Sequence, residues 1–181
     1  MIRFAHRLRG PAVLGAILAL AACDVEQPAA EAAPPPAAAE KAAAPDPAAD
    51  APIPAGFEAL EVVTQKGRTR FFVEIADTDA KRQQGLMRRA SLSPDRGMLF
   101  DFHRPQPVAF WMKDTWIPLD IIFIQSDGTV LTIARNTTPY SEAPIPSGGP
   151  IRGVLEIAGG RAAEIGLLPG DKVEHRIFAG G

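Results

Sequence analysis

Four acidic side chains stand within or beside apolar runs of this sequence, where burial can shift the acidity of a carboxyl group. They are Asp101, Asp120, Glu156 and Asp171. Two such groups within reach of one bond could perform general acid–base catalysis, as in glycoside hydrolysis. Sequence spacing does not reveal which of them meet, so no catalytic residue is assigned. Asp171 follows Pro169-Gly170, a context typical of a turn.

Asp120 is the strongest of these candidates because it lies inside the strand-like run 119–124, which is otherwise apolar on both faces. A carboxylate there is costly to bury unless it is paired or hydrogen-bonded. We therefore expect Asp120 to be ionised and paired with Lys113, with Arg88 or Arg96 as alternative cations. The resulting hypothesis is a small polar pocket formed by Lys113, Thr115, Asp120 and Glu156.

Other chemistries lack the residue patterns that they require. Beyond the N-terminal segment the chain has His103 and His175, and no Cys or His spacing typical of zinc. It has no Gly-x-Ser-x-Gly elbow and no glycine loop followed by a phosphate-binding Lys. We expect no metal and no cofactor, and an enzyme is the less favoured class. His175 alternates with Val173 and Ile177, which is typical of a packed or edge histidine.

The N-terminal 22 residues have the pattern of an export signal. Arg3, Arg7 and Arg9 precede the apolar run 11–22, which is too short to span a bilayer as a helix. The run ends in Leu-Ala-Ala-Cys, which resembles the lipobox of bacterial lipoproteins. We predict that residues 1–22 are removed and that Cys23 is lipidated, which anchors the chain to a membrane. The alternative is an ordinary secretory signal with a chance cysteine.

Residues 23–56 are predicted to be a lipidated cysteine followed by a disordered tether. From position 24 to 56, 14 of 33 residues are Ala and 8 are Pro. The prolines interrupt every turn of a potential helix, and no apolar periodicity is available for burial. Six acidic residues against one lysine give this segment a net charge of −5. Since Cys23 is the only cysteine, the chain cannot form an internal disulfide.

Residues 57–181 are predicted to be the folded domain, with 15 basic and 15 acidic residues. This balance argues against nucleic acid as a partner. Strands are predicted at 71–75, 97–102, 119–125, 129–134, 154–157 and 172–178, and helices at 78–87 and 159–166. Asp127-Gly128 predicts a type I′ hairpin. The fold class is α+β and β-rich: a small, strongly twisted sheet or partly closed barrel with two short helices.

Five short motifs occur in order along this domain. They are GLM at 85–87, RGMLFDF at 96–102, FWMKDTWIPLDIIFI at 110–124, VLEI at 154–157 and PGD at 169–171. With these motifs, nearly all of the predicted domain resembles the domain of unknown function 192 family. Asp114 stands where members of that family often carry Asn. The resemblance implies a compact, β-rich and commonly exported fold, and it implies no established activity.

Three functions are consistent with these features. The favoured one is an envelope lipoprotein whose domain, in the periplasm, binds an envelope protein or a small ligand as an accessory module. The first alternative is a carboxylate-dependent enzyme acting on an envelope carbohydrate or peptide, with Asp120 and Glu156 as its acids. The second alternative is a structural component of the envelope. In all three, the membrane is a partner through the lipid anchor.

Overall fold

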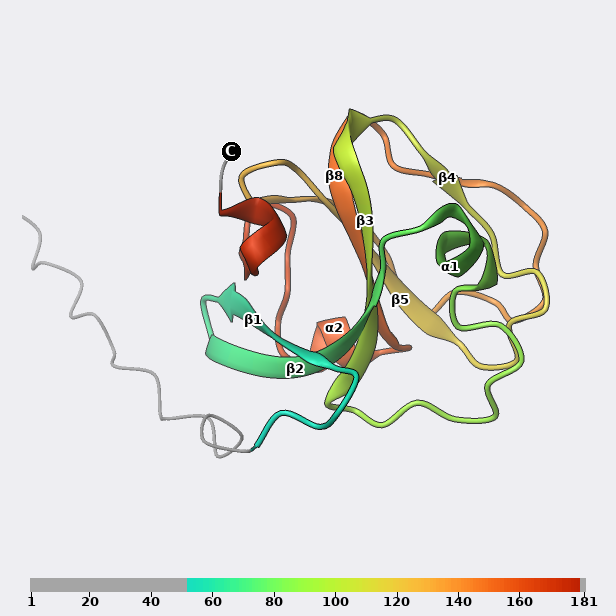
Figure 1. The fold of residues 1–181 in the computed structure, drawn as a ribbon, viewed down its shortest axis with the longest axis horizontal. Helices are drawn as coiled ribbons and strands as arrows, with labels where there is room; N and C mark the ends of the chain where they lie inside the picture. The colour runs from blue at the N-terminus through green and yellow to red at the C-terminus, as the bar shows by residue number, and fades with distance from the viewer. Residues whose placement is uncertain (1–51, 180–181) are drawn as a thin grey trace, which may run out of the picture. The chain divides into compact units, whose positions relative to one another are not determined.

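The structure is a computed structural model that describes residues 52–179 (Figure 1). The strands are β1 (Glu58–Thr64), β2 (Gly67–Ala76), β3 (Arg96–Gln106), β4 (Ala109–Phe110), β5 (Leu119–Ile124), β6 (Val130–Ala134), β7 (Ile145–Pro146), β8 (Ile151–Ala158) and β9 (Lys172–Glu174). The helices are α1 (Asp79–Gln84), α2 (Arg161–Glu164) and the 3-10 helix η1 (Arg176–Phe178). The predicted signal, Cys23 and the tether up to residue 51 lie outside the described residues.

Seven strands form one sheet in the order β6-β5-β8-β3-β2-β1-β9, and β4 pairs with β7 in a small second sheet. Neighbours in the large sheet are antiparallel except β2 and β3, which are parallel. Parallel neighbours need a crossover connection. Here the chain from Asp77 to Asp95, which contains α1, makes that crossover, and it places α1 on one side of the sheet (Figure 1).

The two ends of the large sheet meet at one corner. Thr129 and Lys172 form an isolated antiparallel bridge, and the Val130 N–H donates to the Asp171 carbonyl at 2.9 Å. The Val173 N–H donates to the Gly128 carbonyl at 2.8 Å. The sheet is therefore a curled half-barrel, which confirms the predicted β-rich α+β class with two short helices.

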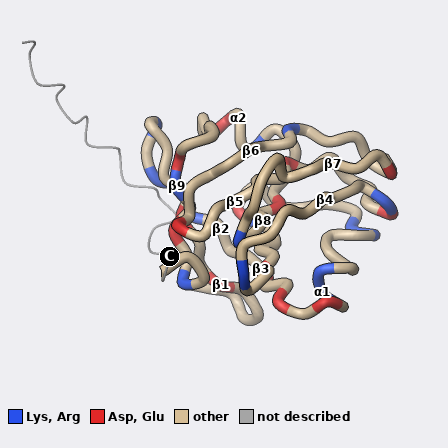
Figure 2. Tube along the Cα trace, turned by 90° about the horizontal axis from the view of Figure 1, so that it is seen from above, with Lys and Arg blue, Asp and Glu red and all other residues tan. Residues whose placement is uncertain are grey.

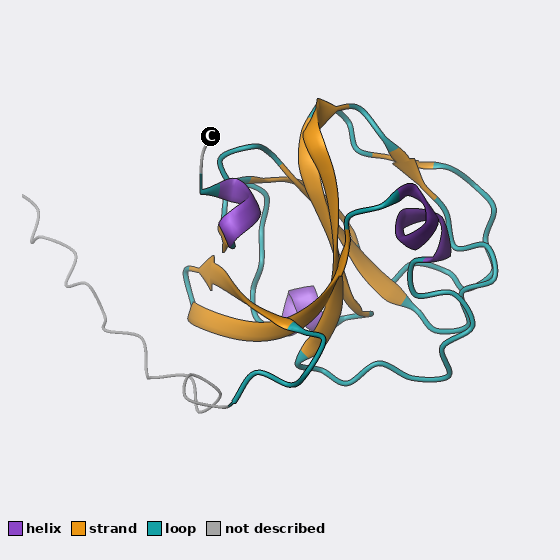
Figure 3. Cartoon of the chain, viewed as in Figure 1, coloured by secondary structure: helices purple, strands orange, loops and turns teal. Residues whose placement is uncertain are grey.

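Alternation along the strands gives the sheet two buried faces. Inside the curl, one core joins residues from most strands with α2 and η1, including Phe71, Leu99, Ile122, Ile157, Ala162 and Phe178. The outer face carries a second core that includes Met98, Phe100, Met112, Ile121, Phe123 and Val154. Long loops lie on this outer side together with α1 (Figure 3). Because both faces are covered, β5 is buried at all six positions, as predicted.

The hairpin of β5 and β6 is confirmed, but its predicted turn type is wrong. A type I′ turn needs positive φ at both central residues. Here Gly128 has φ of 83°, whereas Asp127 is not among the residues with positive φ. The Asp127 carboxylate accepts from the Thr129 N–H at 2.9 Å and from Lys172 Nζ at 2.8 Å. These bonds hold a longer loop, and the pairing register shifts between Phe123 and Ile124.

The predicted last strand is too long. Strand β9 ends at Glu174, and His175 caps η1 through its Nδ1, which accepts from the Ile177 N–H at 3.5 Å. His175 Nε2 lies 3.1 Å from a Glu58 carboxylate oxygen, so its imidazole packs at the sheet edge. Strand β1 and the short pair β4 and β7 were not predicted, and α1 ends three residues earlier than expected, at Gln84.

Candidate functional site

A cleft of about 660 Å³ lies on the outer side of the sheet, between α1, the segment after it, and β4. It is lined by Asp79, Arg82, Gln83, Gln84, Gly85, Leu86, Met87, Phe100, Phe102, Val108, Ala109, Phe110, Trp111, Lys113, Asp114, Thr115 and Glu156. This volume is within the range of small-ligand sites in proteins. The lining combines apolar side chains with polar ones from α1, from the loop after β4 and, as Glu156, from β8.

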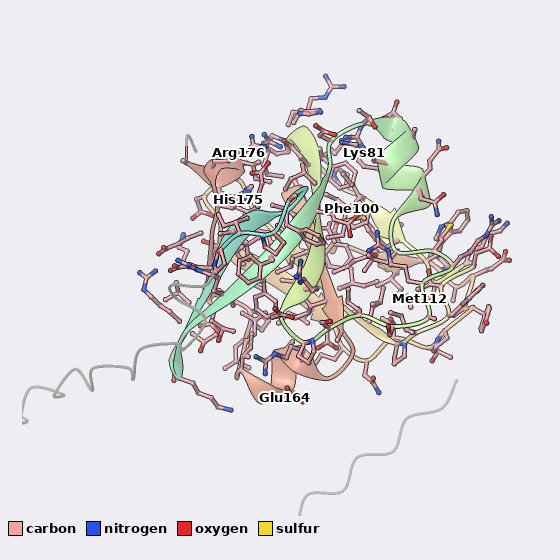
Figure 4. All side chains as sticks on the ribbon, turned by 60° about the horizontal axis from the view of Figure 1, so that its bottom comes forward. Lys81, Phe100, Met112, Glu164, His175 and Arg176 are labelled. Carbon is pink, nitrogen blue, oxygen red and sulfur yellow. The ribbon has the colours of Figure 1, made fainter. Side chains whose placement is uncertain are left out.

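Aromatic rings form one wall of the cleft. The Phe110 ring lies at the centre of the group, with ring centroids 5.1 Å from Phe100 and 5.9 Å from Phe123, both edge to face. Phe102 lies 6.3 Å from Phe110. In Figure 4, Phe100 lies in the middle of the domain, near Lys81 of α1 and far from Glu164. Edge-to-face contacts fix ring orientation, so this wall is held in shape before any ligand arrives.

Glu156, on β8, is the one lining residue whose carboxyl group is buried without a partner. It is 5% exposed, and its Oε2 makes no hydrogen bond within the described residues. Its neighbours across the sheet are Ile121 and Met98, which offer no donor. Burial raises the pKa of Glu156 to about 8, and the nearby Arg89 guanidinium acts weakly in the opposite direction. At pH 7 the group is mainly neutral and can donate as well as accept a hydrogen bond.

Arg89 does not neutralise Glu156, because it is already bound elsewhere. Its guanidinium donates to both carboxylate oxygens of Glu74, at 2.5 and 2.9 Å. Glu74 lies in the same cross-strand row as Glu156, with Met98 between them. The row thus contains one acid that has a cation and one that has none.

Gly85 leaves open space beside Glu156. The residue ends α1 with φ of 47° and ψ of −140°, a conformation that other residues adopt only with strain. A Cβ atom added there would lie 3.3 Å from Phe100 Cζ and 3.9 Å from Glu156 Oε2. The glycine therefore permits the backbone conformation that ends α1, and its lack of a side chain leaves space next to the buried carboxyl group.

One lining residue, Asp114, and its backbone partner Arg88 adopt left-handed backbone conformations. Arg88 and Asp114 both have positive φ, of 60° and 54°, and the Arg88 N–H donates to the Asp114 carbonyl at 2.8 Å. Non-glycine residues in this region are uncommon, and they cluster at binding sites. At the adjacent rim, Lys113 Nζ lies 5.7 Å from the centre of the half-exposed Trp111 ring.

Of the four residues of the predicted polar pocket, Lys113, Thr115 and Glu156 line this cleft and Asp120 does not. Asp120 pairs with Ile157 across the sheet, whereas Glu156 pairs with Ile121, so the two carboxyl groups point to opposite faces. The expected pairing of Asp120 with Lys113 is wrong, because strand parity turns Asp120 toward α2.

Backbone amides take the place of that cation. One Asp120 oxygen accepts from the N–H groups of Asn136 at 2.6 Å and Gly160 at 3.1 Å. The other accepts from the Ala162 N–H at 2.7 Å. Asp120 is fully buried, and these three bonds join β5 to the start of α2 and to the end of β6.

The other acidic candidates are also engaged in structural contacts. Asp101 accepts from the His103 N–H at 2.6 Å and forms an ion pair with Arg152. Asp171 accepts from the Leu168 N–H at 2.7 Å, the turn geometry expected for it. Among residues 52–179, no three or more His, Cys, Asp or Glu side chains are grouped so that they could hold a metal ion.

Comparison with known families identifies the domain. Residues 61–175 match the family model DUF192, described as "Uncharacterized ACR". The chain belongs to the DUF192 family. This match confirms the resemblance drawn from the five sequence motifs.

Two solved structures resemble this DUF192 domain. One, from Sinorhizobium meliloti 1021, is described as a "putative transcription regulator"; it is 45% identical, and the alignment covers 65% of this chain and 92% of that chain, with a TM-score of 0.64. The other, a protein of unknown function from Novosphingobium aromaticivorans DSM 12444, is 46% identical over 66% of this chain and 85% of that chain, with a TM-score of 0.65. Among curated proteins, none matches the chain.

Sequence reasoning missed most of the cleft in this DUF192 domain. Gly85 and Trp111 belong to motifs that carry the family resemblance, yet nothing in their spacing shows that they line one cleft with Glu156. Phe100 and Phe102 were expected only as strand residues, and Phe110 lay outside every predicted strand. The long crossover between β2 and β3 was the one available signal, because it had to pass over one face of the sheet.

No helix within the described part of the chain is long and apolar enough to cross a membrane.

Proposed function

We propose that this DUF192 protein is a binding module of the cell envelope, whose outer cleft takes a small ligand or a short segment of a partner. The observation that carries the proposal is the Glu156 carboxyl group, which is buried at the cleft with an oxygen that lacks a hydrogen-bond partner among the described residues. An unpaired buried polar atom costs about 1–3 kcal/mol. A ligand that donates to this oxygen recovers that loss, and the aromatic wall supplies apolar contact.

The arrangement of acids supports binding over catalysis. The enzyme alternative required Asp120 and Glu156 on either side of one bond, and these groups lie on opposite faces of the sheet. Asp79 and Asp114 also line the cleft, but Asp79 is largely exposed and bound to Arg82 at 2.5 Å. Glu156 therefore has no buried acidic partner for two-carboxyl chemistry among the lining residues.

The Sinorhizobium relative, as a "putative transcription regulator", raises transcriptional regulation as another function. The described part of this chain gives that function little support, because basic and acidic residues are interspersed along its trace (Figure 2). Nucleic-acid affinity depends on a concentration of Lys and Arg over one surface. We retain the binding-module proposal and expect no nucleic acid as its partner.

Ligand occupancy of the cleft can be tested by NMR with defined fragments. The ¹⁵N-labelled full chain, in detergent micelles, is titrated separately with N-methylacetamide, N-acetylglucosamine, n-butylamine and benzyl alcohol. We expect at least one fragment to shift the Gly85 amide and the Trp111 indole signals. The Trp116 indole is a control, since this half-exposed tryptophan is not part of the cleft lining. Fragments that shift both indoles equally, or neither, contradict the proposal.

The envelope location rests on the sequence of the N-terminal segment, and it has its own test. Mass spectrometry of the membrane-extracted protein is expected to give a mature chain that begins at Cys23 and carries acyl groups. A chain that begins elsewhere, or an unmodified Cys23, would remove the anchor from the proposal. The cleft would then still be a binding site, in a protein that reaches its ligand in another way.

A further inference from the structure

The edge of β4 that faces away from β7 has no strand partner among the described residues, because these two strands form a sheet of their own. Ala109 pairs with Pro146 and Phe110 with Ile145. The Ser147 N–H donates to the Val108 carbonyl at 2.9 Å, and hydrogen-bonding residues alternate along an antiparallel strand. The alternation directs the backbone groups of Val108 and Phe110 toward β7, and those of Ala109 and Trp111 toward the opposite edge.

The cleft runs along that opposite edge. Val108 and Phe110 pack against the outer core, while Ala109 and Trp111 are exposed on the other face of the strand. All four residues line the cleft. A cavity that touches both faces of one strand must lie beside its edge. The residues of α1 and Gly85 line the cleft as well, and α1 and β4 lie on the same side of the sheet (Figure 1).

Among the acids and arginines around the cleft, the buried Glu156 carboxyl stands apart, while Lys113 at the rim lies over the Trp111 ring. The Arg82 guanidinium is occupied by Asp79 at 2.5 Å, by the Asp77 carbonyl at 2.9 Å and by the Asp101 carbonyl at 2.6 Å. Arg89 is occupied by Glu74. Among the described lining residues, the buried acidic group without a hydrogen bond or an ion pair is the Glu156 carboxyl. Its complement is a basic side chain, which the neighbouring aromatic rings can also contact favourably.

We propose that an extended peptide segment of a partner protein adds as a strand to the free edge of β4 and directs a Lys or Arg side chain to Glu156. The inference rests on the proposed binding function and names its ligand class. Main-chain hydrogen bonds to Ala109 and Trp111 supply affinity that does not depend on the peptide sequence. The pocket at Glu156 supplies specificity, the usual division in strand addition. On binding, the Glu156 carboxyl loses its proton to solvent and pairs with the basic group.

The probes are blocked pentapeptides, acetyl-Thr-Val-Xaa-Val-Thr-amide, in which Xaa is Lys, Gln, Leu or Glu. A second Lys peptide, N-methylated at alternate amides, keeps the side chains but cannot pair as a strand. Each is titrated into the ¹⁵N-labelled full chain, in wild type and in Glu156→Gln. Dissociation constants come from the chemical shifts, and hydrogen exchange is followed at the Ala109 and Trp111 amides.

We expect the Lys peptide to bind at least tenfold more tightly than the Gln and Leu peptides, and to slow exchange at Ala109 and Trp111. N-methylation should weaken it at least tenfold, and Glu156→Gln should abolish the preference for Lys. If the Lys and Gln peptides bind equally well, the claim that Glu156 selects a basic side chain is wrong. If the N-methylated peptide binds as well as the unmodified one, the claim that the peptide pairs as a strand is wrong. If fragments occupy the cleft and no peptide does, this inference fails while the proposed function stands; if neither binds, both fail.

Discussion

Two buried acidic residues on neighbouring strands of this domain have opposite surroundings. Asp120 on β5 faces the inner core, and its oxygens accept three backbone N–H groups. Glu156 on β8 faces the outer core, and its Oε2 accepts none from the described residues. They are offset by a single residue in the strand register. Burial alone therefore does not show whether an acid is satisfied within the fold, whereas the number of its hydrogen-bond partners does.

The largest effect is expected from Asp120→Ala. Removing the carboxyl group leaves three buried N–H donors unpaired, at about 1–3 kcal/mol each in unfolding free energy. We expect a loss of about 4 kcal/mol in guanidinium denaturation at pH 7. Asp171→Ala is the control, because that turn carboxyl accepts only the Leu168 N–H among the described residues, and we expect it to lose about 1 kcal/mol. Equal losses in the two variants would contradict a special structural role for Asp120.

Glu156→Gln is expected to raise the free energy of unfolding, whereas Asp120→Ala lowers it. The pKa of Glu156 is raised from 4.5 to about 8 in the folded protein. Its protonated form therefore contributes stability that is complete below pH 4.5 and is lost as the pH rises toward 8. The glutamine variant does not titrate, so relative to wild type its stability should rise by about 4 kcal/mol between pH 4.5 and pH 8.5. The amide also lacks a partner, which limits the gain.

Denaturation curves between pH 4.5 and 9 measure this difference. Glu174→Gln is a suitable control, because Glu174 is exposed, its pKa is lowered by Arg68, and loss of such a surface pair costs less than about 1 kcal/mol. Wild type and Glu156→Gln losing stability in parallel would mean that Glu156 finds a partner in solution, and the contrast with Asp120 would disappear.

A smaller effect distinguishes loss of space in the cleft from general backbone strain, by comparing two Gly→Ala variants. Gly85→Ala and Gly148→Ala both place a side chain at positive φ, 47° and 76°, and each should cost about 1–2 kcal/mol. Only the first adds a methyl group near Glu156 Oε2. We therefore expect fragment or peptide binding to fall at least tenfold in Gly85→Ala and to be unchanged in Gly148→Ala. A similar fall in both variants would attribute binding to general stability.

The smallest effect concerns the acid that shares its row with Glu156. Arg89 opposes the upward shift in the pKa of Glu156, so replacing the pair by Glu74→Gln with Arg89→Gln removes that opposition. The titration midpoint of the Glu156 carboxyl, followed by ¹³C NMR, should rise further above 8 by less than about one pH unit. A downward movement would show that water enters the site when the pair is lost.

Much of the fold was predictable because the apolar runs of the strands and the residues at the turns indicated it. The apolar run 119–124 and its return at 129–134 gave the hairpin, and Pro118 marked the strand start, where β5 begins one residue later. β1 was missed because its sequence, EALEVVT, places apolar residues side by side and lacks the regular alternation that marks a strand. The end of β9 depended on the His175 side chain capping η1, a contact that strand alternation cannot anticipate.

The site was less predictable because two side chains meet only if they point to the same face of the sheet. Closeness in the sequence does not decide this. Asp120 was correctly expected to be buried, whereas Glu156 was singled out only as an acid between apolar residues that could equally face water. Their assignment to one pocket required knowledge of the pairing between β5 and β8, in which Asp120 stands opposite Ile157. Lys113 and Thr115 were placed in the cleft by the loop after β4, whose path follows from tertiary contacts such as the Tyr140 N–H bond to the Thr115 carbonyl.

The pairing of β1 with β9 determines when this domain can complete its folding. Glu61 on β1 stands opposite Glu174 on β9, so a strand made early in synthesis waits for one made near the end. Contacts between such distant residues close large loops, and domains rich in them fold over about milliseconds to seconds. Until residue 174 has left the ribosome, β1 lacks its second neighbour. A chain that is still incomplete therefore cannot close its barrel, which suits the export proposed for it.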